Sequence, residues 1–145
     1  MDDFNNMRIK LFEEFGNSRE IEISRKGGTI FGMLHSKREY FENWLMKERL
    51  DDETRGFFAM FPDNKLLPIA ILKNLEVDHK IRGNGLGNDL MSAFLNEASD
   101  AKNVVLIADA AETNDFDLVK WYAGWGFTKI GSTGSHFPVM VLNNY

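Results

Sequence analysis

The sequence predicts an α/β protein whose helices pack on a mixed β-sheet. The observations behind this class are an alternating β-rich stretch, an apolar run of the kind found in buried strands, and an amphipathic helical segment after each of them. In chain order the segments are strand 66–77, helix 88–98, strand 104–108, helix 116–123, and strands 127–130 and 139–142. Strands that alternate with helices in this way are typical of a mixed sheet with helices on it.

The first third of the chain carries weaker patterns. Residues 7–15 have the spacing of a short amphipathic helix, and residues 20–24 alternate polar and apolar side chains as a strand does, with a Lys-Gly-Gly turn after them. Residues 36–50 place aromatic and apolar side chains at helical spacing. Ser36, with Glu39 three residues later, has the pattern of a capping box, so we expect a helix capped by Ser36.

The middle of the chain leads to a glycine-rich loop. Residues 56–61 are rich in aromatic side chains and predict a strand, and the Pro-Asp-Asn-Lys segment 62–65 predicts a tight turn. The alternation of the next stretch ends in Leu75, Glu76 and Val77, and the loop follows. The helix after the loop is expected to bury the side formed by Leu86, Leu90, Met91 and Phe94.

Composition is that of an ordinary globular protein. The chain has 145 residues, 43% hydrophobic and 27% charged, which predicts one domain over residues 1–145. No apolar run approaches the roughly 20 residues of a membrane span, and the N-terminus is polar rather than a secretory signal. With no cysteine, the chain has no disulfide, thiolate zinc site or Cys nucleophile. We therefore expect a cytoplasmic protein that does not contact a membrane.

Net charge and histidine spacing argue against two classes of partner. The net charge is −5 at pH 7, so a polyphosphate backbone would be repelled on average, which disfavours nucleic-acid binding. His35, His79 and His136 do not have the spacing of a metal site. We therefore expect no bound metal.

The glycine-rich loop 82–87 between a strand and a helix suits a phosphate group. Glycines let the backbone approach an anion, and the helix N-terminus adds roughly half a positive charge. The Walker pattern needs Gly-Lys-Ser/Thr, which is absent. The dinucleotide pattern needs a third glycine where this chain has Asn88 or Leu90. Both nucleotide fingerprints therefore fail.

Two segments resemble the GNAT N-acetyltransferases. Arg82-x-x-Gly85-x-Gly87 is similar to the family signature Arg/Gln-x-x-Gly-x-Gly/Ala, which begins the helix that cradles the pyrophosphate of acetyl-CoA. The segment 121–127, Trp-Tyr-Ala-Gly-Trp-Gly-Phe, looks like the family's aromatic-Tyr-x-x-x-Gly-Phe. The resemblance covers residues 66–142 and implies the GNAT acyl-CoA N-acyltransferase fold, in which two parallel strands of the mixed sheet splay apart.

The resemblance implies an acetyl-CoA-dependent N-acyltransferase that acetylates a primary amine of a small molecule, peptide or protein by direct attack. Tyr122 would protonate the leaving thiolate. The alternative for Tyr122 is that it is an aromatic residue of the core. Glu76 or a water chain would be the base. The alternative for Glu76 is that it is a solvent-exposed residue of the strand with no role in the reaction. The implied cofactor-binding residues are Leu75, Val77, Arg82, Gly83, Asn84, Gly85, Leu86, Gly87, Asn88 and Asp115.

Two other functions stay open. The stretch 68–78 is similar to the strand of toxin-type members that acetylate aminoacyl-tRNA, but those are usually basic and this chain is acidic. A non-catalytic acyl-CoA-binding module is the third reading, and Tyr122 argues against it because binding alone does not need the phenol. The acceptor and the oligomeric state stay open, with a homodimer among the alternatives.

Overall fold

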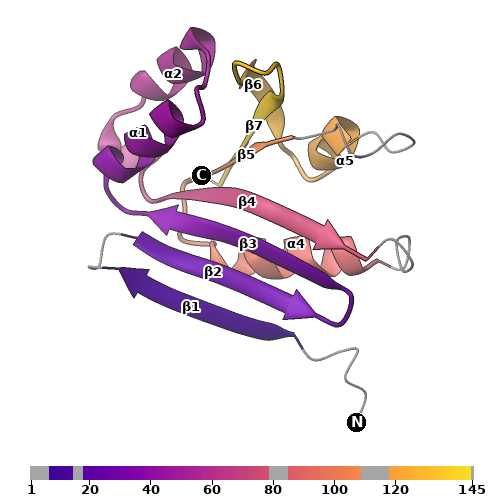
Figure 1. Cartoon of the computed structure of the whole chain (residues 1–145). Coiled ribbons are helices and arrows are strands. Elements are labelled where there is room, and N and C mark those ends of the chain that lie inside the picture. The colour runs from indigo at the N-terminus through magenta and orange to yellow at the C-terminus, as the bar shows by residue number, and fades with distance from the viewer. Residues whose placement is uncertain (1–6, 15–17, 79–84, 109–117, 145) are drawn as a thin grey trace.

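The computed structural model describes residues 7–14, 18–78, 85–108 and 118–144, and in this part of the chain seven strands form one sheet in the order β1-β2-β3-β4-β5-β7-β6 (Figure 1). The strands are β1 (Arg8–Glu14), β2 (Ser18–Arg25), β3 (Gly28–His35), β4 (Ile69–Val77), β5 (Asn103–Ile107), β6 (Thr128–Ser132) and β7 (Pro138–Asn143). The helices are α1 (Arg38–Lys47), α2 (Asp52–Ala59), α3 (Asp63–Leu66), α4 (Leu86–Glu97) and α5 (Leu118–Gly124).

The sheet is mixed, as the sequence predicts. Neighbouring strands pair antiparallel except β4 and β5, which are parallel. The connection between these two strands contains α4, which packs against β2, β3 and β4. Helices α1 and α2 lie near the end of β3 and the start of β4, and α5 lies beside β5, β6 and β7 (Figure 1). The β4-α4-β5 unit therefore sits at the centre of the molecule.

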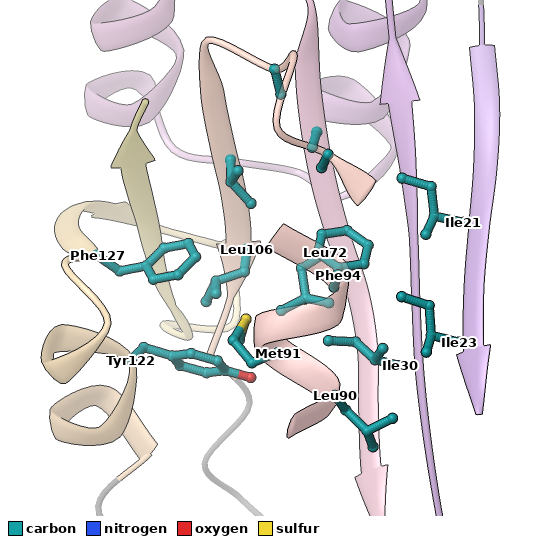
Figure 2. Packing of buried hydrophobic residues seen from close by; sticks show 14 of the residues in the cluster. Ile21, Ile23, Ile30, Leu72, Leu90, Met91, Phe94, Leu106, Tyr122 and Phe127 are labelled. Atoms are coloured by element: carbon teal, nitrogen blue, oxygen red, sulfur yellow. The ribbon is translucent and has the colours of Figure 1, made fainter. Parts of the chain in front are cut away.

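The core has two parts, which pack on opposite faces of β4. Ala70 and Leu72 belong to the cluster beneath α4 and α5, where Leu90, Met91 and Phe94 are buried as predicted (Figure 2). Ile69 and Ile71 belong to the second cluster, which the aromatic residues of α1 and α2 cover. Because side chains alternate along a strand, both faces of this half of β4 are buried.

A β-bulge in β4 changes which face its later side chains occupy. Gly32 lies opposite Leu72 and Phe31 lies opposite Asn74, so Lys73 is the extra residue. Beyond it, Leu75 and Val77 pack against the α4 cluster, although simple alternation would place them on the other face.

The bulge lies opposite Gly32 of β3, where the structure leaves no room for a side chain. A Cβ at Gly32 would lie 2.4 Å from the Ile71 carbonyl oxygen and 2.5 Å from the Phe94 ring. We expect Gly32→Ala to lower the free energy of unfolding by about 1–3 kcal/mol, measured by urea denaturation. Gly56→Ala is the matched control, because a Cβ there meets nothing within 4 Å and helix α2 should gain about 0.5–1 kcal/mol. Equal stability of Gly32→Ala and wild type would contradict the close approach.

In the N-terminal third one prediction was wrong and one strand was missed. Residues 7–15 were expected to be helical, but 8–14 form β1, whose Ile9 and Leu11 pair with Ile23 and Ile21. The spacing of apolar residues there fits either element, and pairing with β2 decides between them. Strand β3, which the sequence patterns did not indicate, completes the hairpin.

The predicted strand 56–61 was also wrong, because most of it lies in α2. The Asp51 carboxylate accepts hydrogen bonds from the Thr54 N–H (2.9 Å) and hydroxyl (2.6 Å) and so caps this helix. The aromatic residues that suggested a strand instead pack edge to face around Phe57 and Phe58 (centroids 5.2 Å apart).

Two smaller features near these helices also differ from prediction. Helix α1 begins after Lys37 with no side-chain cap, so the capping box at Ser36 does not form. Residues 63–66 form the short helix α3 in place of the predicted tight turn.

Candidate active site

The parallel strands β4 and β5 separate along their length, which confirms the predicted splay. They pair from Ile69 with Asn103 to Leu72 with Leu106. Beyond Leu72, β4 continues for five residues to Val77, whereas β5 ends at Ile107. The described part of the sheet therefore opens into a gap just after the bulge at Lys73.

A cleft of about 710 Å³ occupies this gap on the side of α5. Its floor is the second half of β4, from Leu72 to Asp78, and one wall is the turn between β2 and β3, from Gly27 to Thr29. The opposite wall includes the end of β5 and Tyr122 of α5. This larger cleft brings together four residues that the sequence singled out: Leu75, Glu76, Val77 and Tyr122.

A second cleft, of about 530 Å³, lies on the side of α1. Its walls are the end of α1, from Trp44 to Arg49, and the loop 133–137 between β6 and β7. The two clefts share Leu72, Lys73 and Ile107. They therefore meet at the point where the strands part.

Tyr122 is held in a buried position at the larger cleft. Only 6% of the residue is exposed, and its ring lies 5.2 Å from that of Trp121 and 5.9 Å from that of Phe127 (centroids). Figure 2 shows the side chain reaching from α5 toward Met91 of α4. Burial raises the pKa of Tyr122 to about 12, because the phenolate would lose hydration. The phenol is therefore a proton donor throughout the neutral range.

The N-terminus of α4 lies beside the end of β4. Gly85 is its N-cap, with φ +80, a left-handed conformation that glycine adopts most readily. Leu86 is buried, so only its backbone can face a ligand. A Cβ at Gly87 would lie 3.8 Å from both Val77 and Trp121. The first-turn N–H groups, including that of Asn88, have no partner within the helix and suit an anion.

Of the other predicted site residues, one lines the larger cleft and four lie outside the described part of the chain. Glu76 is exposed, lies opposite Thr29 of β3 and lines the larger cleft. The predicted roles of Arg82, Gly83, Asn84 and Asp115 fall on residues outside the described part of the chain.

The described residues contain neither a cluster of metal ligands nor a membrane-spanning helix. No three His, Asp or Glu side chains there lie close enough together to hold a metal ion. None of the helices in that part of the chain has the length and apolar character needed to span a bilayer.

The smaller cleft is the part of the site that sequence patterns did not reveal. Its residues come from four separate segments, and only the β4 segment lies in a stretch, 68–78, that the sequence resemblance had singled out. Asp51 stabilises one wall, because its second carboxylate oxygen accepts a hydrogen bond from the Ser132 N–H (3.0 Å), which ties α2 to β6. Hydrogen bonds from the Thr54 side chain and backbone are the main cause that lowers the pKa of Asp51.

The loop that forms the other wall is fixed by its own hydrogen bonds. The Gly134 N–H donates to the Arg49 carbonyl (2.9 Å), and the Phe137 N–H donates to the Thr133 hydroxyl (3.2 Å). These bonds hold the wall against the end of α1.

A protein-family comparison assigns the chain to one family. The family model described as "Acetyltransferase (GNAT) domain" matches residues 29–137. No curated protein matches the sequence significantly.

Solved structures share the fold at low identity. A nourseothricin acetyltransferase is 17% identical with a TM-score of 0.52, over 94% of this chain and 71% of its own. A bacterial toxin is 17% identical with a TM-score of 0.53, over 88% and 68%. Arabidopsis thaliana Naa50, in complex with the bisubstrate analogue CoA-Ac-MVNAL, is 17% identical with a TM-score of 0.50, over 86% and 70%.

Proposed function

Because this chain belongs to the GNAT acetyltransferase family, we propose that it transfers an acetyl group from acetyl-CoA to a primary amine of a small molecule, peptide or protein. The observation that carries the proposal is the pair of clefts that meet at Leu72, Lys73 and Ile107. One cleft can hold the acyl donor and the other the acceptor, so that both reach the gap between β4 and β5.

The larger cleft suits acetyl-CoA. The pyrophosphate would lie at the N-terminus of α4, where Gly85 and Gly87 leave the backbone open, with Arg82 as its cationic partner. The pantetheine arm would run along β4 past Leu75, whose backbone would polarise the thioester carbonyl. A similar fold in Naa50 holds a CoA-containing analogue, which supports this assignment.

The residues at the gap supply the proton transfers of a direct attack. The acceptor nitrogen bonds to the acetyl carbon and the carbon–sulfur bond breaks. An alkyl ammonium with a pKa near 10.4 is only about 1 part in 10³ neutral at pH 7, so Glu76 or a water chain would take its proton. The leaving thiolate would receive a proton from Tyr122.

A thiol-release assay with acetyl-CoA tests the proposal over amines, peptides and aminoacyl-tRNA. Release that depends on an amine supports the transferase. Binding of acetyl-CoA without release from any acceptor would favour a non-catalytic acyl-CoA-binding module. Release with aminoacyl-tRNA alone, together with salt-sensitive tRNA binding, would favour the toxin-type reaction.

The role of Glu76 as base predicts a pH-dependent defect. We expect Glu76→Gln to depress kcat/KM at neutral pH, and the deficit to shrink as the pH rises toward the pKa of the amine, where less deprotonation is needed. The measurement is a pH–rate profile of both proteins with one acceptor. Glu53→Gln, an exposed carboxylate of α2 outside both clefts, is the control. A deficit in kcat/KM that does not change with pH would indicate that Glu76 positions the acceptor. The absence of any deficit would indicate that Glu76 is a solvated strand residue with no role in the reaction.

A further inference from the structure

The smaller cleft carries charge opposite to that of the whole protein. The net charge of the chain is −5, yet the described residues lining this cleft include two cations, Arg49 and Lys73, against one carboxylate, Glu48. Arg19, Arg25 and Arg38 form ion pairs, and none of the three lines this cleft. Within the described residues, neither cation of the cleft has an ion-pair partner.

Arg49 is held at the cleft in an unfavourable backbone conformation. Its φ is +53, in the left-handed region, which costs a non-glycine residue about 1–2 kcal/mol. Two backbone hydrogen bonds keep it there: its N–H donates to the Met46 carbonyl (3.1 Å), and its carbonyl accepts from Gly134 (2.9 Å). Glycine would fit this position at less cost. The conformation belongs to the Schellman turn that ends α1, in which the Leu50 N–H also donates to the Leu45 carbonyl (3.2 Å). This turn places Arg49 at the wall of the cleft.

Lys73 brings the second cation to the junction of the clefts. It is the extra residue of the β4 bulge and lines both clefts. Its charge also acts into the protein, because the pKa of His35 is lowered first by burial and then by Lys73. A polycationic acceptor would therefore meet repulsion at the reacting end and at Arg49.

Apolar surface forms much of the rest of the cleft. Ile107 and Phe137 are half-buried, and 8% of Trp44 is exposed. We propose that the acceptor is a small amine with an apolar body and a carboxylate, such as an apolar amino acid, and that Arg49 binds the carboxylate. Lys73 adds to the same field. This inference rests on the proposed function.

Binding of the reaction products tests the inference without relying on turnover or on amine basicity. The probes are N-acetylphenylalanine, which is anionic, and its neutral carboxamide, titrated by calorimetry into the protein with CoA present. We expect the anion to bind about tenfold tighter or more, as one charge-assisted hydrogen-bonded pair provides. Arg49→Gln should remove most of this preference while the carboxamide affinity stays unchanged.

Two further variants complete the experiment. Arg55→Gln removes the same charge from an exposed position of α2 outside both clefts, so the ratio should stay at its wild-type value. Lys73→Met should reduce the ratio in part. Equal or undetectable binding of the two products, or a ratio unchanged in Arg49→Gln, overturns the inference.

The outcome is separable from the fate of the proposed function. Thiol release with polycationic amines or with amines that carry no carboxylate, together with equal binding of the two products, would support the proposed transferase and overturn the inference. An anion preference that depends on Arg49, without thiol release from any amine, would support the acceptor assignment of the cleft and count against transfer.

Discussion

Gly85→Asp is expected to lose acetyl-CoA binding by about 100-fold or more while the protein stays folded. The new carboxylate would stand at the N-terminus of α4, where the pyrophosphate is proposed to bind, and would take the place of the anion. Folding should tolerate the change, because a Cβ at Gly85 meets nothing within 4 Å. Aspartate also accepts the left-handed φ of +80 better than most residues. Calorimetry with acetyl-CoA measures the loss.

Gly85→Asn separates the charge from the side chain. Asparagine has nearly the same size and the same tolerance of a left-handed backbone, but it carries no charge. It should therefore lose much less affinity than the aspartate variant. Thermal unfolding of both variants checks that each is folded. Wild-type affinity in Gly85→Asp would place the pyrophosphate elsewhere.

Tyr122→Phe is expected to lower kcat by about 10²–10⁴ with little change in acetyl-CoA affinity. Only the hydroxyl is removed, so the ring contacts with Trp121 and Phe127 remain. The wild-type phenol has a pKa of about 12 and stays protonated at neutral pH. The wild-type rate should therefore show no loss through ionisation of Tyr122 at pH 10, the ordinary pKa of tyrosine, and such a loss should begin only as the pH approaches about 12.

Tyr40→Phe is the control for loss of a phenol. Tyr40 lies on α1, is 37% exposed and lines neither cleft, so its loss should leave kcat unchanged. Steady-state thiol release with one good acceptor compares the three proteins. Wild-type turnover in Tyr122→Phe would show that the leaving thiolate needs no acid at this position, and that Tyr122 serves the core alone.

Local patterns were sufficient where one segment contains the whole signal. The spacing of Leu86, Leu90 and Phe94 predicted the buried side of α4, and the structure buries all three. Gly85 and Tyr122 were singled out by short motifs, and they lie at the helix N-terminus and at the larger cleft. These features follow from the period of a helix and from the conformational freedom of glycine, which are properties of neighbouring residues.

Local patterns failed where two elements compete for the same residues. The spacing of 8–14 suits a helix or an edge strand, and only pairing with β2 selects the strand. The aromatic run around Phe57 suggested a strand, but the cap at Asp51 and packing between rings make it a helix. For the strand the deciding contacts come from outside the local pattern, whereas the cap at Asp51 is itself local and was not recognised in the sequence.

The sequence by itself determined the central β4-α4-β5 unit, the glycine-capped helix start and the tyrosine of α5. Only the tertiary structure decided where an acceptor could bind. Arg49, Lys73 and the loop 133–137 lie far apart in the chain and share no motif, yet they line one cleft. The bulge at Lys73 depends on pairing with β3, and the Arg49 carbonyl accepts a hydrogen bond from Gly134 of the distant loop. Which segments meet is set by packing of the whole fold, and no local spacing encodes it.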